Sequence, residues 1–252
     1  MSKSSIEWTD AVWNFVLGCT KCSPGCANCY AIGEVARERC EAHKGLATLK
    51  PVRNWTGLLR FVPTRLPEPL RRTKPTTWFV NSLSDFFHED IPVDWQIAGL
   101  EVMRMADWHI FQLLTKREDQ LRRLLNGDLN EYADLPNVMW GVSVEDRKFG
   151  LPRIEALRQT PAKIRWLSIE PLLEDLGEID LDGIHWVVVG GESGLDARPM
   201  KEEWVWPIKQ QCDDAGVPFF FKQWGGVNKK KTGRLLGGRE YNESLLIEEV
   251  AR

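Results

Sequence analysis

Seven short apolar runs, separated by stretches with helical character, constrain the fold of this chain more than any other feature. The runs are rich in β-branched and aromatic residues and span 13–17, 77–81, 109–114, 138–142, 164–167, 185–189 and 218–221. Several are apolar at nearly every position, as expected of strands that are buried on both faces of a sheet. Strands that alternate with helices form βα units. We therefore predict an α/β protein with a parallel sheet.

Helices are expected at 28–43, 95–107, 118–126 and 151–159, in a stretch that ends at 215, and at 243–251. Asn28 and Asp94 can cap the first two of these helices, because their side chains accept hydrogen bonds from free backbone N–H groups. Pro207 either begins the fifth helix or kinks it. Residues 46–76 show little periodicity, so we expect an irregular excursion there and an extension after residue 225.

Polar residues follow each of the seven runs. A cysteine-rich stretch follows the first run, and the later tips are 81–85, 115–117, 143–146, 168–171, 190–194 and 222–224. In a parallel barrel the carboxyl ends of the strands gather on one face, where barrel enzymes keep their active sites. One polar tip says little, because loops are polar in general. Seven such tips predict an enzyme with its cavity at the carboxyl ends of the strands.

Four cysteines, Cys19, Cys22, Cys26 and Cys29, fall within eleven residues. Thiols this dense are typical of a site for a soft metal. Structural zinc favours two Cys-x2-Cys pairs with a longer spacer than the three residues 23–25 found here. Cysteines separated by two or three residues are typical of iron–sulfur ligation. We favour an iron–sulfur cluster, keep zinc as the alternative, and regard disulfides or free thiols as the weakest interpretation.

Composition favours an intracellular enzyme. With 43% hydrophobic residues, the chain can build a full core, and residues 1–252 are expected to form a single domain. The first residues lack an apolar signal core and no apolar run approaches membrane length, so we expect a cytoplasmic protein without membrane contact. The net charge of −3 gives no overall attraction to nucleic acid. Basic residues in 60–74 and at Lys229–Lys231 can contact phosphates, but solvated loops are the favoured interpretation.

The chain resembles the phage-associated three-cysteine-motif family, a radical-SAM-like group of largely unassigned function. The matching segments are IEWTDAVWN, GCTKCSPGCANCYA, FVNSLSDFFHEDIP, FQLLTKR, LPNVMWGVSVED, LSIEPLL, WVVVGGESG and FFFKQWG, spread over nearly the whole chain. The resemblance implies a partial (β/α) barrel of about six to seven parallel strands, of the radical SAM type. It also implies two cofactors, a [4Fe–4S] cluster and S-adenosylmethionine (SAM). In such enzymes the reduced cluster cleaves SAM, and the resulting deoxyadenosyl radical abstracts hydrogen from the substrate.

The same resemblance implies which thiols hold the cluster. The three cysteines of the family correspond to Cys19, Cys26 and Cys29, and Cys22 is an addition in this chain. The spacing Cys22-x3-Cys26-x2-Cys29 instead reproduces that of the wider radical SAM superfamily. We favour the first set, with Cys22 close by as a substitute, and we expect Tyr30 to shield the cluster.

Contacts to SAM are implied at the tips of the second, fourth and sixth runs: Ser82, Ser84, Asp85, Ser143, Glu145, Gly190, Gly191, Glu192 and Ser193. Asp85 and its neighbouring hydroxyls suit the methionine ammonium, and Ser143 with Glu145 suits the carboxylate or the ribose. The two glycines let the backbone approach a ligand closely, and the two residues after them suit the ribose. A turn capped by Asp85 and an ordinary βα turn at the glycines are the structural alternatives.

Lys116, Glu170 and Lys222 are the candidates for catalysis on the substrate side, with Arg117 beside them. Structural ion pairs with nearby carboxylates are an equally good interpretation of the two lysines. The substrate is unknown, with a nucleobase, nucleotide or phage DNA preferred. Expected partners are SAM, an electron donor such as flavodoxin or ferredoxin, and a further partner protein.

Two other functions stay open. The first is a zinc-stabilised nucleic-acid-binding protein with a structural four-cysteine site. The second is an inactive iron–sulfur scaffold that acts through a partner protein.

Overall fold

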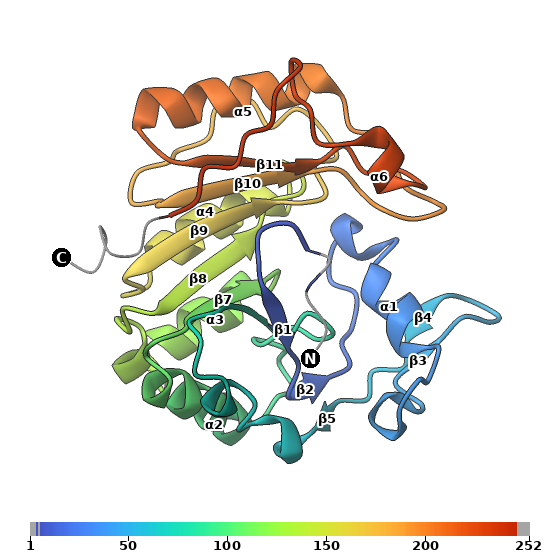
Figure 1. Cartoon of the computed structure of the whole chain (residues 1–252), viewed down its shortest axis with the longest axis vertical. Helices are drawn as coiled ribbons and strands as arrows, with labels where there is room; N and C mark the ends of the chain where they lie inside the picture. The colour runs from blue at the N-terminus through green and yellow to red at the C-terminus, as the bar shows by residue number, and fades with distance from the viewer. Residues whose placement is uncertain (1–3, 5, 246–252) are drawn as a thin grey trace.

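A curled sheet of seven parallel strands forms the body of the protein (Figure 1). The computed structural model describes residue 4 and residues 6–245. The strands, in their order across the sheet, are β1 (Ala11–Trp13), β6 (Thr77–Val80), β7 (Ile110–Thr115), β8 (Val138–Ser143), β9 (Ile164–Ile169), β10 (Trp186–Gly190) and β11 (Phe219–Gln223). Every neighbouring pair is parallel. The predicted α/β partial barrel of seven parallel strands is therefore confirmed.

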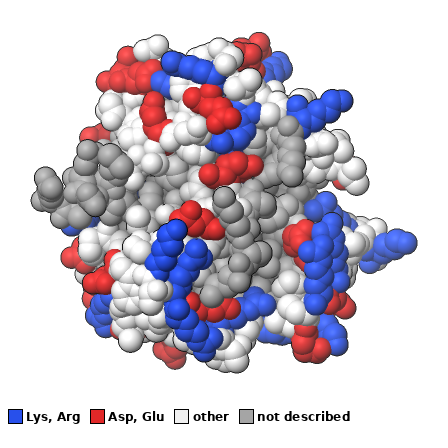
Figure 2. Space-filling view, in the orientation of Figure 1, with Lys and Arg blue, Asp and Glu red and all other residues white. Residues whose placement is uncertain are grey.

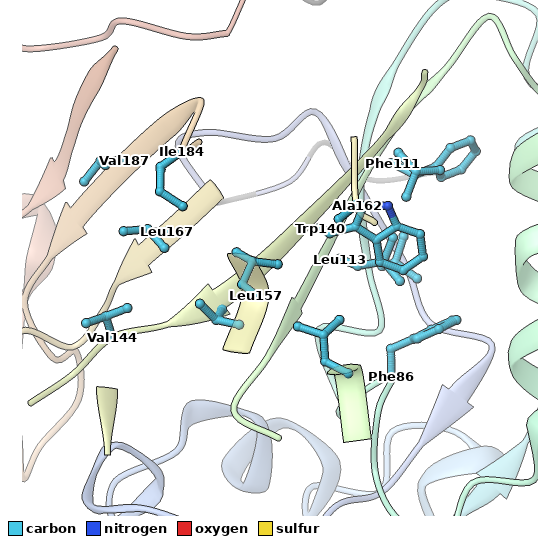
Figure 3. Packing of buried hydrophobic residues seen from close by; sticks show 14 of the residues in the cluster. Phe86, Phe111, Leu113, Trp140, Val144, Leu157, Ala162, Leu167, Ile184 and Val187 are labelled. Atoms are coloured by element: carbon cyan, nitrogen blue, oxygen red, sulfur yellow. The ribbon is translucent and has the colours of Figure 1, made fainter. Parts of the chain in front are cut away.

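Four helices cover the convex face of the sheet: α2 (Val93–Met105), α3 (Glu118–Leu125), α4 (Gly150–Arg158) and α5 (Glu202–Ala215). Their apolar residues form one core with every second residue of the strands. Trp140, Leu167 and Val187 belong to that core, and Leu157 of α4 packs among them (Figure 3). The burial of both sheet faces explains why the strand sequences are apolar at nearly every position.

A second, smaller core lies on the concave face. It contains the alternate strand residues Phe79, Met139, Trp166, Trp186 and Phe220, together with others of the same parity. Trp8, from the segment before β1, packs into this core, with its ring centroid 4.8 Å from that of Phe79 and 5.2 Å from that of Trp166. Because side chains alternate between faces, the same parity carries Lys116, Ser143, Glu170, Gly190 and Lys222 to the concave side at the strand ends.

The expected excursion over 46–76 contributes no strand to the seven-stranded sheet. It holds β3 (Ala47–Thr48), β4 (Asn54–Trp55) and β5 (Arg60–Phe61), with two short 3-10 helices at Pro63–Arg65 and Pro69–Arg71. β3 pairs with β4, and β5 pairs with β2 (Val16–Leu17), both in antiparallel fashion. The ring of Phe61 stacks on that of Trp95 at 5.0 Å, which docks the excursion on α2.

Three expectations at the N-terminal side were wrong. The first run is split, because the chain leaves the sheet after Trp13 and pairs with the excursion as β2. The helix expected at 28–43 is only α1 (Tyr30–Val35), followed by a 3-10 turn at Glu41–His43. Neither predicted cap is formed: Cys29 and Pro92 occupy the N-cap positions of α1 and α2, without a side-chain cap hydrogen bond.

The other helices follow the predictions closely. Helix α5 begins at Glu202 and includes Pro207 in its interior, so the proline does not start the helix. The extension after residue 225 contains α6 (Lys229–Thr232) and then runs along the outer edge of β11, where the N–H of Phe221 donates to the carbonyl of Tyr241 at 2.9 Å. The helix predicted at 243–251 lies outside the described residues from 246 onward, and residues 243–245 are not helical.

Charges of both signs are mixed on the surface. On the face in Figure 2, Lys and Arg side chains are interspersed with Asp and Glu side chains. Arg60 donates to two backbone carbonyls of residues 41 and 42, and Arg65 donates to the carbonyl of Asn14, so both serve the packing of the excursion. Among the described residues, no helix is long and apolar enough to cross a membrane.

Candidate metal and active site

The cysteine loop, which we define as residues 18–29, lies at the carboxyl ends of the strands. Its base is tied to the tip of β6, because the N–H of Gly18 donates to the carbonyl of Leu83 at 3.1 Å. A Cβ at residue 18 would lie 2.1 Å from the carbonyl oxygen of Leu58, and φ there is +94°. Only glycine fits this close crossing of the loop and the excursion.

The middle of the loop docks on the tip of β8. The Ser23 hydroxyl donates a hydrogen bond to the carboxylate of Glu145, which is fully buried. Arg153 of α4 donates to the same carboxylate at 2.5 Å and to Glu118 at 3.0 Å. Burial alone would raise the pKa of Glu145, but the Lys116 ammonium and the Arg153 guanidinium outweigh it, so the pKa is lowered. Glu145 is therefore an ionised anchor for the loop.

The end of the loop docks on the tip of β10. Asn28 donates to the carboxylate of Glu192 at 3.0 Å and to the carbonyl of Asp196 at 2.7 Å. Arg198 binds the same carboxylate through its side chain and its N–H, and it also donates to the carbonyl of Pro24 at 3.0 Å. Hydrogen bonds from Arg198 and Asn28 lower the pKa of Glu192 in spite of its burial.

All four thiols of the loop are free. The sulfurs of Cys22 and Cys26 are 4.0 Å apart. The hydrogen bond between them, together with the nearby Lys116 ammonium, outweighs burial and lowers the pKa of Cys26 to about 5, whereas the pKa of Cys22 is raised. Burial raises the pKa of Cys19 to about 12. Burial also raises the pKa of Cys29.

The four thiols of the loop are soft donors of the kind that bind zinc or an iron–sulfur cluster. In the described part of the chain, no three Cys, His, Asp or Glu side chains converge on one point as a single metal ion requires. A mononuclear zinc site needs four sulfurs at about 2.3 Å from one ion. In a cluster each thiolate binds a different iron, so the sulfurs stay further apart. Four free thiols on one loop are donors that either group can use, so the choice of the cluster is a proposal.

Asp85, expected to bind the methionine ammonium, already has protein partners. Its carboxylate accepts hydrogen bonds from the Thr115 hydroxyl at 2.7 Å, the N–H of Phe87 at 2.9 Å and the N–H of Lys116 at 3.1 Å. The carboxylate thus fixes its own turn and the neighbouring tip of β7, as the structural alternative expects, and a contact to the methionine ammonium stays a prediction.

Ser82 and Ser84 stand at the same tip and are also engaged. Ser82 and Asn14 exchange hydrogen bonds through their side chains at 3.1 and 3.2 Å, and the Ser84 hydroxyl donates to the carbonyl of Val16 at 3.0 Å. Tyr30 donates to the carbonyl of Ser82 at 3.0 Å, which places this aromatic ring over the tip of β6. These contacts tie β1, β2 and α1 together around the cysteine loop.

The two glycines at the tip of β10 lie close to neighbouring segments of the protein. A Cβ on Gly191 would lie 2.1 Å from the carbonyl oxygen of Trp224, and one on Gly190 would lie 3.0 Å from the carboxylate of Glu170. Gln223 donates to the Ser193 hydroxyl at 3.2 Å. Backbone packing therefore requires glycine at position 191, whereas a Cβ at position 190 would meet only the end of the Glu170 side chain, and a SAM contact at this tip stays a prediction.

Two of the three predicted catalytic residues meet on the concave face. The Lys222 ammonium lies 2.5 Å from the carboxylate of Glu170, and the Trp8 indole N–H donates to the other oxygen of that carboxylate at 3.1 Å. The ammonium also lies 5.6 Å from the centroid of the Trp8 ring. Lys116, at the tip of β7 on the same side of the sheet, lies apart from this pair and acts by its charge on Glu145 and the Cys26 thiol.

Several residues of the site were missed by the sequence reasoning. Trp8, Ser23, Arg153 and Arg198 each contact a predicted site residue across 6 to 162 positions of sequence. Each of the three carboxylates Glu145, Glu170 and Glu192 has a basic side chain at hydrogen-bond distance. A buried carboxylate needs a nearby cation, so the sequence predicts that each of these carboxylates has a basic partner. The sequence does not tell which Lys or Arg supplies that positive charge.

The fold is that of an α/β protein built on a half barrel of parallel strands, with a cysteine-rich loop at the carboxyl ends of the strands. Residues 3–244 match the family described as "Protein of unknown function (DUF5131)", and the chain belongs to that family. No curated protein matches the chain.

Two solved structures of spore photoproduct lyase are similar to the chain. The complex with dinucleoside spore photoproduct has 14% identity and a TM-score of 0.41, and a point mutant of the enzyme has 13% identity and a TM-score of 0.41. Each match covers 83% of this chain and 62% of the lyase chain, so this protein spans less than two thirds of that length.

Proposed function

We propose that this protein is a radical SAM enzyme whose cysteine loop holds a [4Fe–4S] cluster. The observation that carries the proposal is the position of four free thiols on one loop, at the carboxyl ends of a half barrel of parallel strands. The same edge of a parallel barrel is where such folds place their chemistry. The resemblance of the sequence to the three-cysteine-motif family supports the choice of cofactors.

Cys19, Cys26 and Cys29 would hold the cluster, and Cys22 would stand beside it. When bound, the cluster and SAM supply one-electron chemistry that generates a radical for hydrogen abstraction. The protein supplies the frame: Glu145 and Glu192 hold the loop at two points, and both stay ionised because cations neutralise them. Ser143 and the backbone of the β10 tip lie on this edge of the sheet, and their role as SAM contacts stays a prediction.

Glu170 and Lys222 are the proposed substrate-side pair. Their side chains are 11% and 17% exposed, so the pair is shielded yet reachable from the concave side. In a shielded site an ammonium paired with a carboxylate can bind a polar substrate group or exchange a proton with it. A nucleobase, nucleotide or nucleic acid is the substrate class that we prefer, on the ground of the phage-associated resemblance alone.

The internal hydrogen bonds of Arg60 and Arg65 weigh against the zinc-stabilised nucleic-acid-binding alternative. Two cations of the basic segment that would grip phosphates are committed to backbone carbonyls of the excursion.

The first test measures iron, acid-labile sulfide and zinc in protein purified without oxygen. We expect about four irons and four sulfides per chain. About one zinc without sulfide would overturn the proposal in favour of a structural site. A cluster that never cleaves SAM would instead support the inactive scaffold.

Matched cysteine variants sharpen this test. Cys22→Ala should keep its iron, whereas Cys26→Ala and Cys29→Ala should lose most of it. A four-thiolate zinc site predicts the opposite for Cys22→Ala, which would then lose its metal or unfold. The buried Cys212 gives a control, because Cys212→Ala removes a thiol from the core and leaves the loop intact.

A further inference from the structure

Arg117, at the tip of β7, contacts the base of the cysteine loop, and the proposed function gives it no role. Its Nη2 donates to the carbonyl of Thr20 at 3.0 Å and to the Thr20 hydroxyl at 2.8 Å, and it lies 3.9 Å from the sulfur of Cys19. Only 8% of the side chain is exposed. A buried guanidinium with this geometry holds the backbone and the side chain of Thr20 and lies against the Cys19 sulfur.

The same network continues into the β6 tip. The Thr20 hydroxyl lies 2.9 Å from Nε2 of His88, and the other end of the guanidinium pairs with Glu89. The Nε of Arg117 is buried and has no hydrogen-bond partner among the described residues, with the nearest carboxylate oxygen of Asp85 at 3.8 Å. Thus the buried cation keeps a donor that its protein neighbours leave unused.

Cys22 differs from Cys19 in each of these respects. It is exposed, and its sulfur contacts the carbonyl of Lys116 at 3.9 Å and the sulfur of Cys26 at 4.0 Å. A thiol that is fixed beside a buried cation is better prepared to serve as a permanent ligand than a thiol exposed on the loop, because its side chain loses less freedom on binding.

We propose that Arg117 is a positioning residue that fixes Cys19 as the third cluster ligand and raises the reduction potential of the cluster. This inference rests on the proposed function. Three thiolates give the cluster a negative charge, and a cation or hydrogen bond at a ligating sulfur favours the reduced form, which carries one more electron. Arg117, which contacts residues at the tips of β6 and β7, would therefore make the cluster easier to reduce.

The first experiment uses the full-length protein without metal. Iodoacetamide labelling of each cysteine is followed by mass spectrometry in the wild type, Arg117→Gln and the control Arg122→Gln, whose side chain is exposed on α3. We expect Arg117→Gln to label Cys19 about tenfold more slowly at a fixed pH, because iodoacetamide reacts with the thiolate and the guanidinium 3.9 Å from the sulfur favours that form. Cys22 should label at an unchanged rate, and the buried Cys212 should stay protected, which shows that the fold is intact.

The second experiment measures the midpoint potential of the reconstituted cluster by a redox titration with electron paramagnetic resonance. Arg117→Gln should lower the potential by about 59 mV, a tenfold shift of a one-electron equilibrium. Arg117→Lys keeps the charge and loses the forked geometry, so it should recover part of the potential. Thr20→Val removes one acceptor of the guanidinium and gives a second test if Arg117→Gln does not fold.

The outcomes separate the two proposals. If the wild type holds no cluster, the proposed function fails, and the role of Arg117 in the potential fails with it, while the labelling rates still decide whether Arg117 positions Cys19. If the wild type holds a cluster but Arg117→Gln changes neither the potential nor the Cys19 labelling, the inference is wrong and the proposed function stands. A lower potential with slower Cys19 labelling supports both.

Discussion

The hydroxyl of Ser23 donates a hydrogen bond to the carboxylate of Glu145, 122 positions further along the chain. This contact joins the cysteine loop after β2 to the tip of β8. Because Glu145 is fully buried and also binds Arg153, the loop is attached to an ion pair in the protein interior rather than to a solvated surface. The position of the thiols is therefore coupled to the stability of the fold.

Glu145→Gln should reduce the free energy of unfolding by about 3 kcal/mol, because it leaves the buried Arg153 guanidinium short of one negative charge. Urea unfolding followed by circular dichroism measures the loss. Glu155→Gln is the matched control on the same helix as Arg153, since the Glu155 side chain is exposed and its ion pair with Arg158 should contribute much less to the free energy of unfolding. Equal effects of the two variants would contradict the proposed anchor.

The pair of Glu170 and Lys222 should show a coupling of about 1 kcal/mol in a double-mutant cycle of Glu170→Gln and Lys222→Met. The physical reason is the 2.5 Å contact between groups that are mostly shielded from solvent. Urea unfolding of the wild type, the two single variants and the double variant provides the four free energies. A coupling close to zero would mean that the two side chains do not act as a pair in solution.

Gly141→Ala should destabilise the protein by about 1–3 kcal/mol, the usual cost of overpacking a core. The added Cβ would lie 2.4 Å from the indole of Trp166, which is fully buried and cannot move away. Thermal unfolding measures the change. In Gly33→Ala the Cβ would meet only the end of the Arg53 side chain at 3.1 Å, so this control should lose no stability.

His109 should make the fold less stable in mild acid. Burial lowers its pKa from 6.5, so below pH 6.5 the unfolded chain binds a proton that the folded protein does not take up. Stability is therefore retained above this pH and falls as the pH decreases through 6.5, by up to about 1.4 kcal/mol per pH unit. Urea unfolding at several pH values should show a shallower fall for His109→Gln, and parallel curves would contradict the assignment.

The strands could be predicted well because their signal is local. Apolar runs of four to six residues with β-branched and aromatic side chains identify strands wherever they occur, and six of the seven runs match strands of the sheet within two residues at each end. The first run failed because Val16 and Leu17 are as apolar as a sheet strand but pair with Arg60 and Phe61 of the excursion. Nothing local distinguishes one strand partner from another.

The site residues show a similar division. The tips were correctly expected to follow the strands, but their roles depend on partners that arrive from elsewhere. Asp85 illustrates this, because its carboxylate is used by Thr115 and two backbone N–H groups rather than left open. The functional roles of the tips, and the metal of the cysteine loop, stay predictions.

The sequence by itself determined six of the seven strands, the alternation that sends Glu170 and Lys222 to one face, and the cluster of thiols on one short loop. These features depend on how side chains alternate along a strand and on neighbours a few residues away in the sequence. Only the tertiary structure decided that Glu145 and Glu192 hold the loop and that Arg117 faces Cys19. Those contacts join residues from 98 to 164 positions apart, and each depends on how the sheet curls and where α4 and the β10 tip come to lie.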